Sequence, residues 1–386
     1  MSSAPCTERE SPTGETRAIA RVCFLIDGLA RGGTESQLVE LIRRMNRSRV
    51  QPVLCLLQGE DALSRSLEPP DCPVRRLEVP SLLRPSSVRK VLAFARWLRE
   101  QRIDALQVHF LDSTYFGILA ARLAGIPVIR TRRNVGYWLK PHHTILGRMA
   151  TRCAAYTITN CEAVRQACIV QERARPDSVL VFPNGIDPQR FAAVPDLATQ
   201  WGRRAPVVGA VANLRGVKGL ATLVQAAALV CETNPRVRFV VAGDGEERPP
   251  LERMIAERGL EGRFRLIGGI DDIPDFLAGL DVAVLCSQSE GLSNALLEYM
   301  AAGRAIVATA VGGNVEAIQN EATGLLVPPE APRPLADAID RVLGDRELAL
   351  RFAAAARAEV AERFAWPAVV RRVEDFYLRI AESSQQ

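Results

Sequence analysis

The chain has 386 residues, of which 48% are hydrophobic and 24% are charged, and its formal net charge is +5 at pH 7. This length exceeds one ordinary hydrophobic core and predicts two domains, while the composition is that of a soluble globular protein. No apolar run approaches the roughly 18 residues that a membrane-spanning helix needs, which excludes such a helix.

The cysteines and histidines argue against a metal centre. The nine cysteines are scattered without a Cys-x-x-Cys pair, only three histidines occur, and the sequence contains no Asp-x-Asp motif. An odd number of cysteines without metal-ligand spacing predicts reduced thiols in a cytoplasmic protein. We therefore expect no cofactor and no metal. Residues 1–17 lack the apolar core of a signal peptide and are expected to form a disordered leader.

Charge is divided unevenly along the chain. Up to residue 183 there are 27 Lys+Arg and 17 Asp+Glu, a net charge of +10, which leaves 22 and 27, a net charge of −5, for the rest. A basic N-terminal half suits an anionic membrane or a phosphate-bearing ligand, but a solvated arginine-rich surface explains it equally well. A basic amphipathic helix is expected over residues 87–101. It could lie on a membrane surface, but we favour packing of its apolar stripe on its own sheet.

The N-terminal half alternates short apolar runs with helical patterns. Strands are expected at 18–27, 50–57, 73–78, 104–108, 127–131, 155–159 and 179–182, and helices at 34–45, 87–101, 113–124 and from 161. This alternation predicts a parallel sheet with helical crossovers. The turn-forming sequence P-N-G-I-D, residues 183–187, ends the domain that we place at 18–187, and a linker follows over 188–205.

Two loops that follow strands of this half carry groups suited to a ligand. Gly32 and Gly33 end the turn G-L-A-R-G-G after the first strand, where glycines let backbone N–H groups approach an anion, although a tight turn is the alternative. His109 follows the strand 104–108. Its neutral imidazole could hydrogen-bond a hydroxyl group of a ligand, although a lone histidine is more often structural.

A third strand end is rich in arginine. The strand 127–131 runs into the sequence R-T-R-R-N. Arg132 and Arg133, followed by Asn134, stand where guanidinium groups could bind a phosphate or a carboxylate.

The C-terminal half repeats the alternation. Strands are expected at 206–212, 238–242, 263–267, 282–285 and 305–309, and helices at 220–232, 273–280 and 294–302, with mostly helix from 334 to 381. Residues 282–309 therefore read as a βαβ unit. Glu290 precedes its helix and Glu298 lies inside it, while the N–H groups of Gly291, Leu292 and Ser293 favour an anion. At the carboxyl end of a strand, this set suits a ligand with phosphates and hydroxyls, such as a nucleotide sugar.

The sequence S-E-G-L-S-N-A-L-L-E-x-M-A-x-G, followed by V-A-T-x-x-G-G-x-x-E and T-G-L-L-V, resembles the family-4 retaining glycosyltransferases. The resemblance implies an α/β fold of two facing Rossmann-like domains, called GT-B, with the active site in the interdomain cleft. It implies that 18–187 binds the acceptor and that 206–364 binds the nucleotide sugar. It also implies that a C-terminal helix, within 365–386, packs back on the N-terminal domain.

The resemblance assigns roles to individual residues. It implies that Glu298 binds the ribose, that Lys218 holds the diphosphate and that Glu290 contacts the donor sugar, with His109 facing the reacting sugar. Glu290, His109 and Lys218 are thus the expected catalytic residues. The further donor-site residues expected from the family are Gly32, Gly33, Gly243, Ile270, Gly291, Leu292, Ser293 and Asn294. Arg132, Arg133 and Asn134 are expected at the acceptor.

One position departs from the family pattern. Members usually read G-R-L-x-x-x-K-G where this chain has N-L-R-G-V-K-G, residues 213–219. Lys218 matches the lysine, but Asn213 stands where the arginine is expected. Either Arg215, two residues later, makes the phosphate contact or one cation is missing.

Together these features predict a retaining glycosyltransferase. The expected donor is a nucleoside-diphosphate sugar, most simply UDP- or GDP-linked. The expected acceptor is a glycan or a lipid-linked precursor in surface polysaccharide or exopolysaccharide biosynthesis, at the inner face of the cell membrane. Nucleic acid is not an expected partner. The alternatives are a sugar-nucleotide epimerase or a phosphorylase on the same fold, and a non-catalytic sugar-nucleotide-binding subunit of a polysaccharide assembly.

Overall fold

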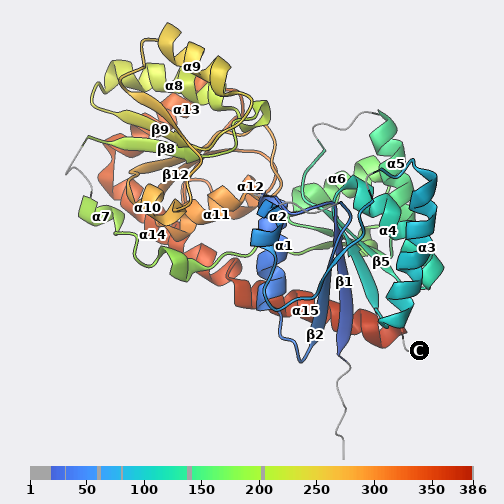
Figure 1. Cartoon of the computed structure of the whole chain (residues 1–386). Helices are drawn as coiled ribbons and strands as arrows, with labels where there is room; N and C mark the ends of the chain where they lie inside the picture. The colour runs from blue at the N-terminus through green and yellow to red at the C-terminus, as the bar shows by residue number, and fades with distance from the viewer. Residues whose placement is uncertain are drawn as a thin grey trace, which may run out of the picture.

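The computed structural model describes residues 19–30, 32–58, 62–79, 81–136, 141–200 and 205–384. It consists of two α/β domains, each with a parallel sheet between helical layers (Figure 1). The expected leader at 1–17 and residues 201–204 of the expected linker lie outside the described residues. Within the described part of the chain, no helix is both long enough and apolar enough to cross a membrane.

The N-terminal sheet has the strand order β3-β2-β1-β4-β5-β6-β7, with every neighbouring pair parallel. Its strands are short and largely buried, as expected when crossover helices cover both faces. They are β1 (Ala20–Ile26), β2 (Val50–Leu56), β3 (Val74–Arg76), β4 (Ala105–Val108), β5 (Val128–Arg132), β6 (Tyr156–Thr159) and β7 (Val179–Val181).

The helices of this domain are α1 (Gly33–Arg44), α2 (Ala62–Leu67), α3 (Pro85–Glu100), α4 (Leu111–Ala124), α5 (Pro141–Cys153) and α6 (Glu162–Glu172). α3, α4 and α5 share one hydrophobic core with the sheet. Val91, Phe94 and Leu98 of α3 are buried in that core, which confirms that the apolar stripe of this helix faces its own sheet. α5 was not predicted, although Ile145, Met149 and Cys153 lie at helical spacing on either side of its central glycine, Gly147.

The C-terminal sheet has the order β10-β9-β8-β11-β12-β13 and is also parallel throughout. Its strands are β8 (Val207–Val211), β9 (Arg238–Ala242), β10 (Phe264–Gly268), β11 (Val282–Leu285), β12 (Ala305–Thr309) and β13 (Leu325–Val327). Its helices are α8 (Leu220–Thr233), α9 (Arg248–Glu257), α10 (Ile273–Ala278), α11 (Asn294–Ala301), α12 (Asn314–Ala317), α13 (Pro332–Gly344) and α14 (Arg346–Arg363). The predicted βαβ unit is β11, α11 and β12.

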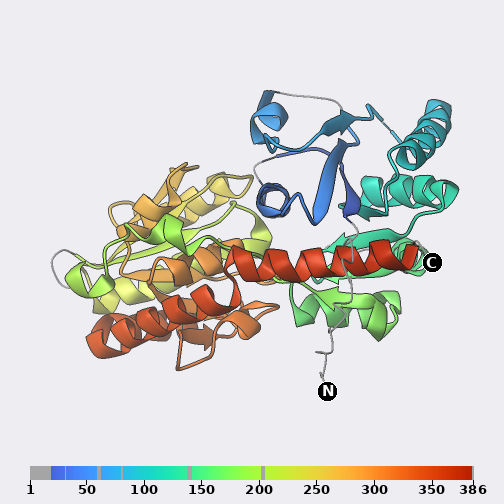
Figure 2. The same cartoon turned by 90° about the horizontal axis from the view of Figure 1, so that it is seen from below.

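The chain crosses between the domains twice, and the two crossings touch. Ile186 donates its N–H to Phe364 O at 2.9 Å, and Trp366 donates to Ile186 O at 3.0 Å. After the second crossing, α15 (Trp366–Ser384) runs along the N-terminal sheet, and Figure 2 shows it spanning the length of that domain. Phe376 and Tyr377 are buried there in one core with β1 and α1. Together with the two sheets, this arrangement confirms the predicted GT-B fold.

Candidate active site

A cavity of about 650 Å³ lies between the two domains and is lined by residues of both. This volume is in the range of sites that hold a small ligand. This cavity is lined by most of the residues that were expected to bind the donor. They are Gly32, Gly33, Asn213, Lys218, Gly243, Ile270, Glu290, Leu292, Ser293, Asn294 and Glu298. These residues lie close together because the carboxyl ends of the strands in a parallel sheet all lie at one edge of that sheet.

Lys218 and Glu290 form an ion pair on the C-terminal wall of the cavity. Lys218 lies in a 3₁₀ turn after β8, and its Nζ donates to Glu290 Oε1 at 2.6 Å. Ser287 Oγ donates to the same oxygen at 2.7 Å. The lysine side chain is 25% exposed and the glutamate 11%, so both groups face the cavity while being held by protein contacts. The pair presents a positive and a negative group together to any ligand in the cleft.

Glu298 lies in the second turn of α11 and also lines the cavity. Burial raises the pKa of this carboxyl to about 7, and Arg190 acts in the opposite direction. Glu298 is therefore partly protonated near neutral pH. In its ionised form it can accept hydrogen bonds from the hydroxyl groups of a ligand.

The N-terminus of α11 and the glycine loop of the other domain approach each other across the cavity. Asn294 Nδ2, at the first residue of α11, donates to Gly33 O at 3.3 Å. Among the described residues, we find no hydrogen-bond acceptor for the N–H groups of Gly291, Leu292 and Ser293. These N–H groups and the positive end of the helix favour an anion.

Gly291 and Gly243 are required by close contacts. A Cβ atom at Gly291 would lie 2.3 Å from Arg133 O of the opposite domain, so only glycine allows this approach. Gly243 has a φ of +137°, and its Cβ would lie 1.9 Å from Ala212 O. Both glycines therefore shape the wall of the cleft.

Asn213 and Arg215 differ in their placement. Asn213 lines the cavity, whereas Arg215 is exposed beyond the residues that line it. Burial raises the pKa of Glu35, at the start of α1, and the charges of Arg133 and Arg215 oppose that rise. The charge of Arg215 therefore acts on a carboxylate of the opposite domain, although Arg215 itself does not line the cavity.

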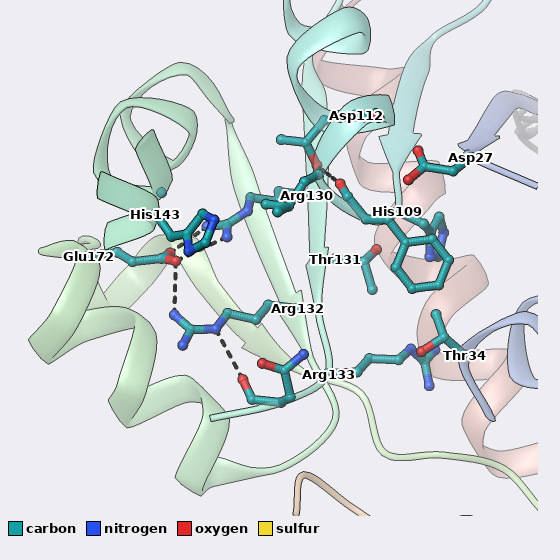
Figure 3. Close-up of a pocket in the computed structure, with 15 residues that line it drawn as sticks. Asp27, Thr34, His109, Asp112, Arg130, Thr131, Arg132, Arg133, His143 and Glu172 are labelled. Carbon is teal, nitrogen blue, oxygen red and sulfur yellow. Dashed lines mark hydrogen bonds and ion pairs between the residues drawn. The ribbon is translucent and has the colours of Figure 1, made fainter. Parts of the chain in front are cut away.

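A second cavity of about 450 Å³ lies within the N-terminal domain, at the carboxyl ends of β1, β4 and β5 (Figure 3). His109, Arg132, Arg133 and Asn134 all line it, as do His143 and Gly147 of the unpredicted α5. Thr34 and Arg133 line both cavities, so the two adjoin.

A buried ion cluster forms the far side of the second cavity (Figure 3). Arg130 Nη2 and Arg132 Nη1 lie 3.0 Å and 2.9 Å from Glu172 Oε1. Thr151 Oγ1 donates to the other carboxylate oxygen at 2.8 Å. Burial opposes ionisation of Glu172, but the hydrogen bonds and charges of both arginines lower its pKa. Glu172 was not predicted as a site residue, because it comes from α6, about 40 residues along the chain from the arginines.

His109 is buried and neutral. Its backbone N–H donates to Leu25 O at 2.9 Å, which joins this residue to the end of β1. Burial lowers the pKa of the imidazole to about 3, and the charge of Arg133 acts in the same direction. Phe110, the next residue, has φ +65° and ψ −179°, a backbone conformation that is strained for any residue except glycine. Such strain at a strand end typically accompanies a functional site.

Hydrogen bonds between the domains hold the cleft together. Asn184 Nδ2 donates across the cleft to Leu292 O at 2.8 Å and to Asn294 Oδ1 at 2.7 Å, while Arg133 Nη1, from the same domain as Asn184, donates to Asn184 Oδ1 at 2.6 Å. Glu316, from the C-terminal domain, accepts the N–H groups of residues 162 and 163 at 2.9 and 3.0 Å and so caps α6 of the other domain. Neither role was predicted for these residues, although Asn184 lies in the motif that ends the first domain.

Comparison with known proteins agrees with this geometry. Residues 32–185 match the family described as "Glycosyl transferase 4-like domain", and residues 198–359 match "Glycosyl transferases group 1". The chain is 31% identical over 285 residues to the 2-deoxystreptamine glucosyltransferase of Streptomyces kanamyceticus, covering 68% of this chain and 73% of that protein. The chain belongs to the family-4 glycosyltransferases. It is therefore a glycosyltransferase, and both the fold and the family were predicted from its sequence.

Two further similarities concern this glycosyltransferase. It is 28% identical over 298 residues to the UDP-Gal:alpha-D-GlcNAc-diphosphoundecaprenol alpha-1,3-galactosyltransferase of Escherichia coli, covering 72% of this chain and 77% of that one. Its fold is similar to that of Anabaena Alr3699/HepE, solved in complex with UDP and glucose. The TM-score is 0.78 at 23% identity, over 92% of this chain and 98% of that one.

Proposed function

We propose that this glycosyltransferase moves a sugar from a nucleoside-diphosphate sugar to a glycan or lipid-linked acceptor, with retention of the anomeric configuration. The observation that carries the proposal is the C-terminal wall of the cleft, where Lys218, Glu290, Glu298 and the α11 N-terminus face one cavity. The UDP and glucose bound by HepE and the UDP-Gal named for the E. coli relative support a nucleotide-sugar donor.

Each group on this wall has a part in donor binding. Glu298 accepts hydrogen bonds from the ribose hydroxyls, and Lys218 with the N–H groups at the α11 N-terminus holds the diphosphate. As the bond to the sugar breaks, negative charge grows on the departing diphosphate, and these fixed donors stabilise it. We propose that this stabilisation needs no metal ion, because the ammonium group and the helix N-terminus supply positive charge where it develops.

The reaction takes place where the two cavities meet. The acceptor hydroxyl, bound in the N-terminal cavity, attacks the anomeric carbon on the face from which the diphosphate leaves. The bond from carbon to the acceptor oxygen forms, the bond to the phosphate oxygen breaks, and the acceptor proton passes to that phosphate oxygen. His109 and Glu290 position the sugar from opposite sides. Retention thus results without a covalent enzyme intermediate.

We further propose that the enzyme works at an anionic membrane surface on the cytoplasmic side, in the assembly of a surface polysaccharide. α3, α4 and α5 form a layer on the side of the N-terminal domain away from the other domain (Figure 1). They carry seven Lys and Arg residues against Glu100 and Asp112. Their exposed apolar residues form pairs one turn apart, Val88 with Leu92, Leu119 with Leu123, and Ile145 with Met149. Apolar pairs among excess positive charge are typical of a surface that lies on anionic lipid.

A donor panel tests the proposed reaction. The full-length enzyme is incubated with UDP-, GDP-, ADP- and dTDP-sugars, alone and with lipid-linked or soluble glycan acceptors, in the presence and absence of EDTA. We expect one donor to be consumed, EDTA to have no effect and NMR of the product to show the donor's anomeric configuration. Inversion, or conversion of the donor into its epimer, would contradict the proposal.

A further inference from the structure

Gln107 is a buried polar residue in the otherwise apolar strand β4, and it lies between two functional parts of the molecule. Its Nε2 is 3.3 Å from His109 Nε2 and 3.1 Å from Thr131 Oγ1. On the other side, Tyr377 OH donates to Gln107 Oε1. Tyr377 belongs to α15, the helix that crosses back from the C-terminal domain. The side chain of Gln107 therefore joins this helix to the imidazole of His109.

The hydrogen bonds fix which way the Gln107 amide points. Tyr377 is 1% exposed, and burial raises the pKa of its phenol, so it keeps its proton and needs an acceptor. Gln107 Oε1 is the one acceptor that we find for this proton among the described residues. With the oxygen turned toward Tyr377, the two N–H bonds of the amide point to Thr131 and His109. The opposite orientation would leave the phenol proton buried without an acceptor.

We infer that Gln107 and Tyr377 are positioning residues that hold His109 in the tautomer protonated at Nδ1. A neutral imidazole has one proton, and His109 Nε2 must accept from Gln107, so the proton lies on Nδ1. Nδ1 is buried and has no hydrogen-bond partner among the described residues. His109 lines the N-terminal cavity, and its Nδ1–H, which lies beneath the surface in the absence of substrate, is the donor that this tautomer provides for a substrate oxygen.

The tautomer itself can be observed without any substrate. Long-range proton–nitrogen NMR of the full-length protein, with His109 assigned by the His109→Asn variant, distinguishes protonated from unprotonated ring nitrogens. We expect a protonated Nδ1 and an unprotonated Nε2. Tyr377→Phe removes the phenol proton and frees the amide to turn, so we expect the proton to shift toward Nε2. Tyr156→Phe is the matched control, because Tyr156 packs on Phe376 of α15 and makes no contact with Gln107. An Nε2-protonated His109 in the wild type would overturn the inference.

The consequence for catalysis rests on the proposed function and has its own test. Gln107→Glu places a carboxylate that accepts from Nε2–H and so imposes the other tautomer. We expect both Gln107→Glu and Tyr377→Phe to lower kcat at least about tenfold with little change in the KM of the donor, and Tyr156→Phe to leave both unchanged. Unchanged kcat in Tyr377→Phe after a shift of tautomer would overturn the positioning role. A wild type that consumes no donor would refute the proposed function, while the NMR result would still decide the tautomer.

Discussion

The C-terminal wall of the cleft takes most of its functional groups from residues 287–298, whereas the N-terminal wall takes them from segments as far apart as Asp27 and Glu172. On the C-terminal wall, the end of β11 and the first turns of α11 position Glu290, Glu298 and a run of N–H groups. Lys218 is the main functional group that comes from another part of the chain. On the N-terminal wall, the ends of three strands and residues of four helices, α1, α4, α5 and α6, must come together before the cavity exists. The donor wall is thus a local motif, and the acceptor wall is a product of tertiary packing.

This contrast predicts different consequences for substitutions on the two walls. A change on the C-terminal wall should reduce catalysis or donor binding with little loss of stability. A change in the buried ion cluster of the N-terminal wall should reduce stability first.

Lys218→Ala should have the largest effect on catalysis. Removal of the ammonium that faces the diphosphate should lower kcat/KM by about 10²–10³-fold, because charge develops there in the transition state. Arg215→Ala, which alters an exposed guanidinium outside the cavity lining, should cost less than about tenfold. Steady-state kinetics with the donor found in the panel measures both. An equal loss of kcat/KM in the two variants would mean that Arg215 also binds the diphosphate. That result would contradict the proposal that Lys218 is the one cationic side chain that holds it.

Glu172→Gln should be the most destabilising change. It leaves Arg130 and Arg132 buried without their counter-charge, so the free energy of unfolding in urea should fall by about 3 kcal/mol or more. Glu162→Gln is the control on the same helix. Its carboxylate pairs with Arg165 while 47% exposed, and its loss should cost less than about 1 kcal/mol. Donor affinity, measured by calorimetry, should stay the same in both variants. A donor site lost with Glu172 while the fold persists would mean that the two walls are not separate.

Donor binding should depend on the ionisation of Glu298. Its pKa of about 7 means that the carboxylate is mostly protonated at pH 6 and mostly ionised at pH 8, and the ionised form accepts from ribose hydroxyls. We therefore expect the donor to bind up to about tenfold more tightly at pH 8 than at pH 6. An intact nucleotide sugar is the right ligand, because its diphosphate diester does not titrate in this range. The Glu298→Gln variant should bind with the same affinity at both pH values, and a pH dependence that persists in it would assign the effect to another group.

The smallest expected effect concerns the membrane surface. Replacing Leu119 and Leu123 with Glu should reduce binding to phosphatidylglycerol vesicles several-fold and should not alter turnover of a water-soluble acceptor. Val170→Glu is the control, because Val170 is 73% exposed on α6, outside the α3–α4–α5 layer. Sedimentation with phosphatidylglycerol and phosphatidylcholine vesicles measures the difference. Equal binding to both lipids would contradict a lipid-facing surface. So would a wild-type dimer that becomes a monomer when Leu119 and Leu123 are replaced.

The same contrast explains what sequence alone could predict. Apolar runs alternating with helical patterns predicted every strand except β13 within one or two residues, because a parallel sheet buries its strands on both faces. The βαβ unit at 282–309 and its two glutamates could be predicted together, since the groups are close in sequence. The family resemblance added the GT-B architecture, which neither periodicity nor composition specifies.

The rest depended on contacts between distant segments. The sequence around Arg132 does not predict its ion pair with Glu172. The sequence around His109 does not predict the contact of Tyr377 with Gln107, the hydrogen-bond partner of His109. α5 was also missed, although Ile145, Met149 and Cys153 lie at helical spacing in its sequence, and only the structure shows that Ile145 and Met149 are exposed. The pairing of Lys218 with Glu290 likewise appears only when β8 and β11 lie side by side.

A crystal structure of the enzyme with its donor tests the central claim most directly. The account predicts the nucleotide in the interdomain cavity, with the ribose hydroxyls within hydrogen-bond distance of Glu298 and the diphosphate within reach of Lys218 and the N-terminus of α11. The anomeric carbon should then lie where the two cavities adjoin. A nucleotide bound in the N-terminal cavity, or one bound in the cleft with its ribose away from Glu298, would contradict the assignment of the C-terminal wall as the donor site.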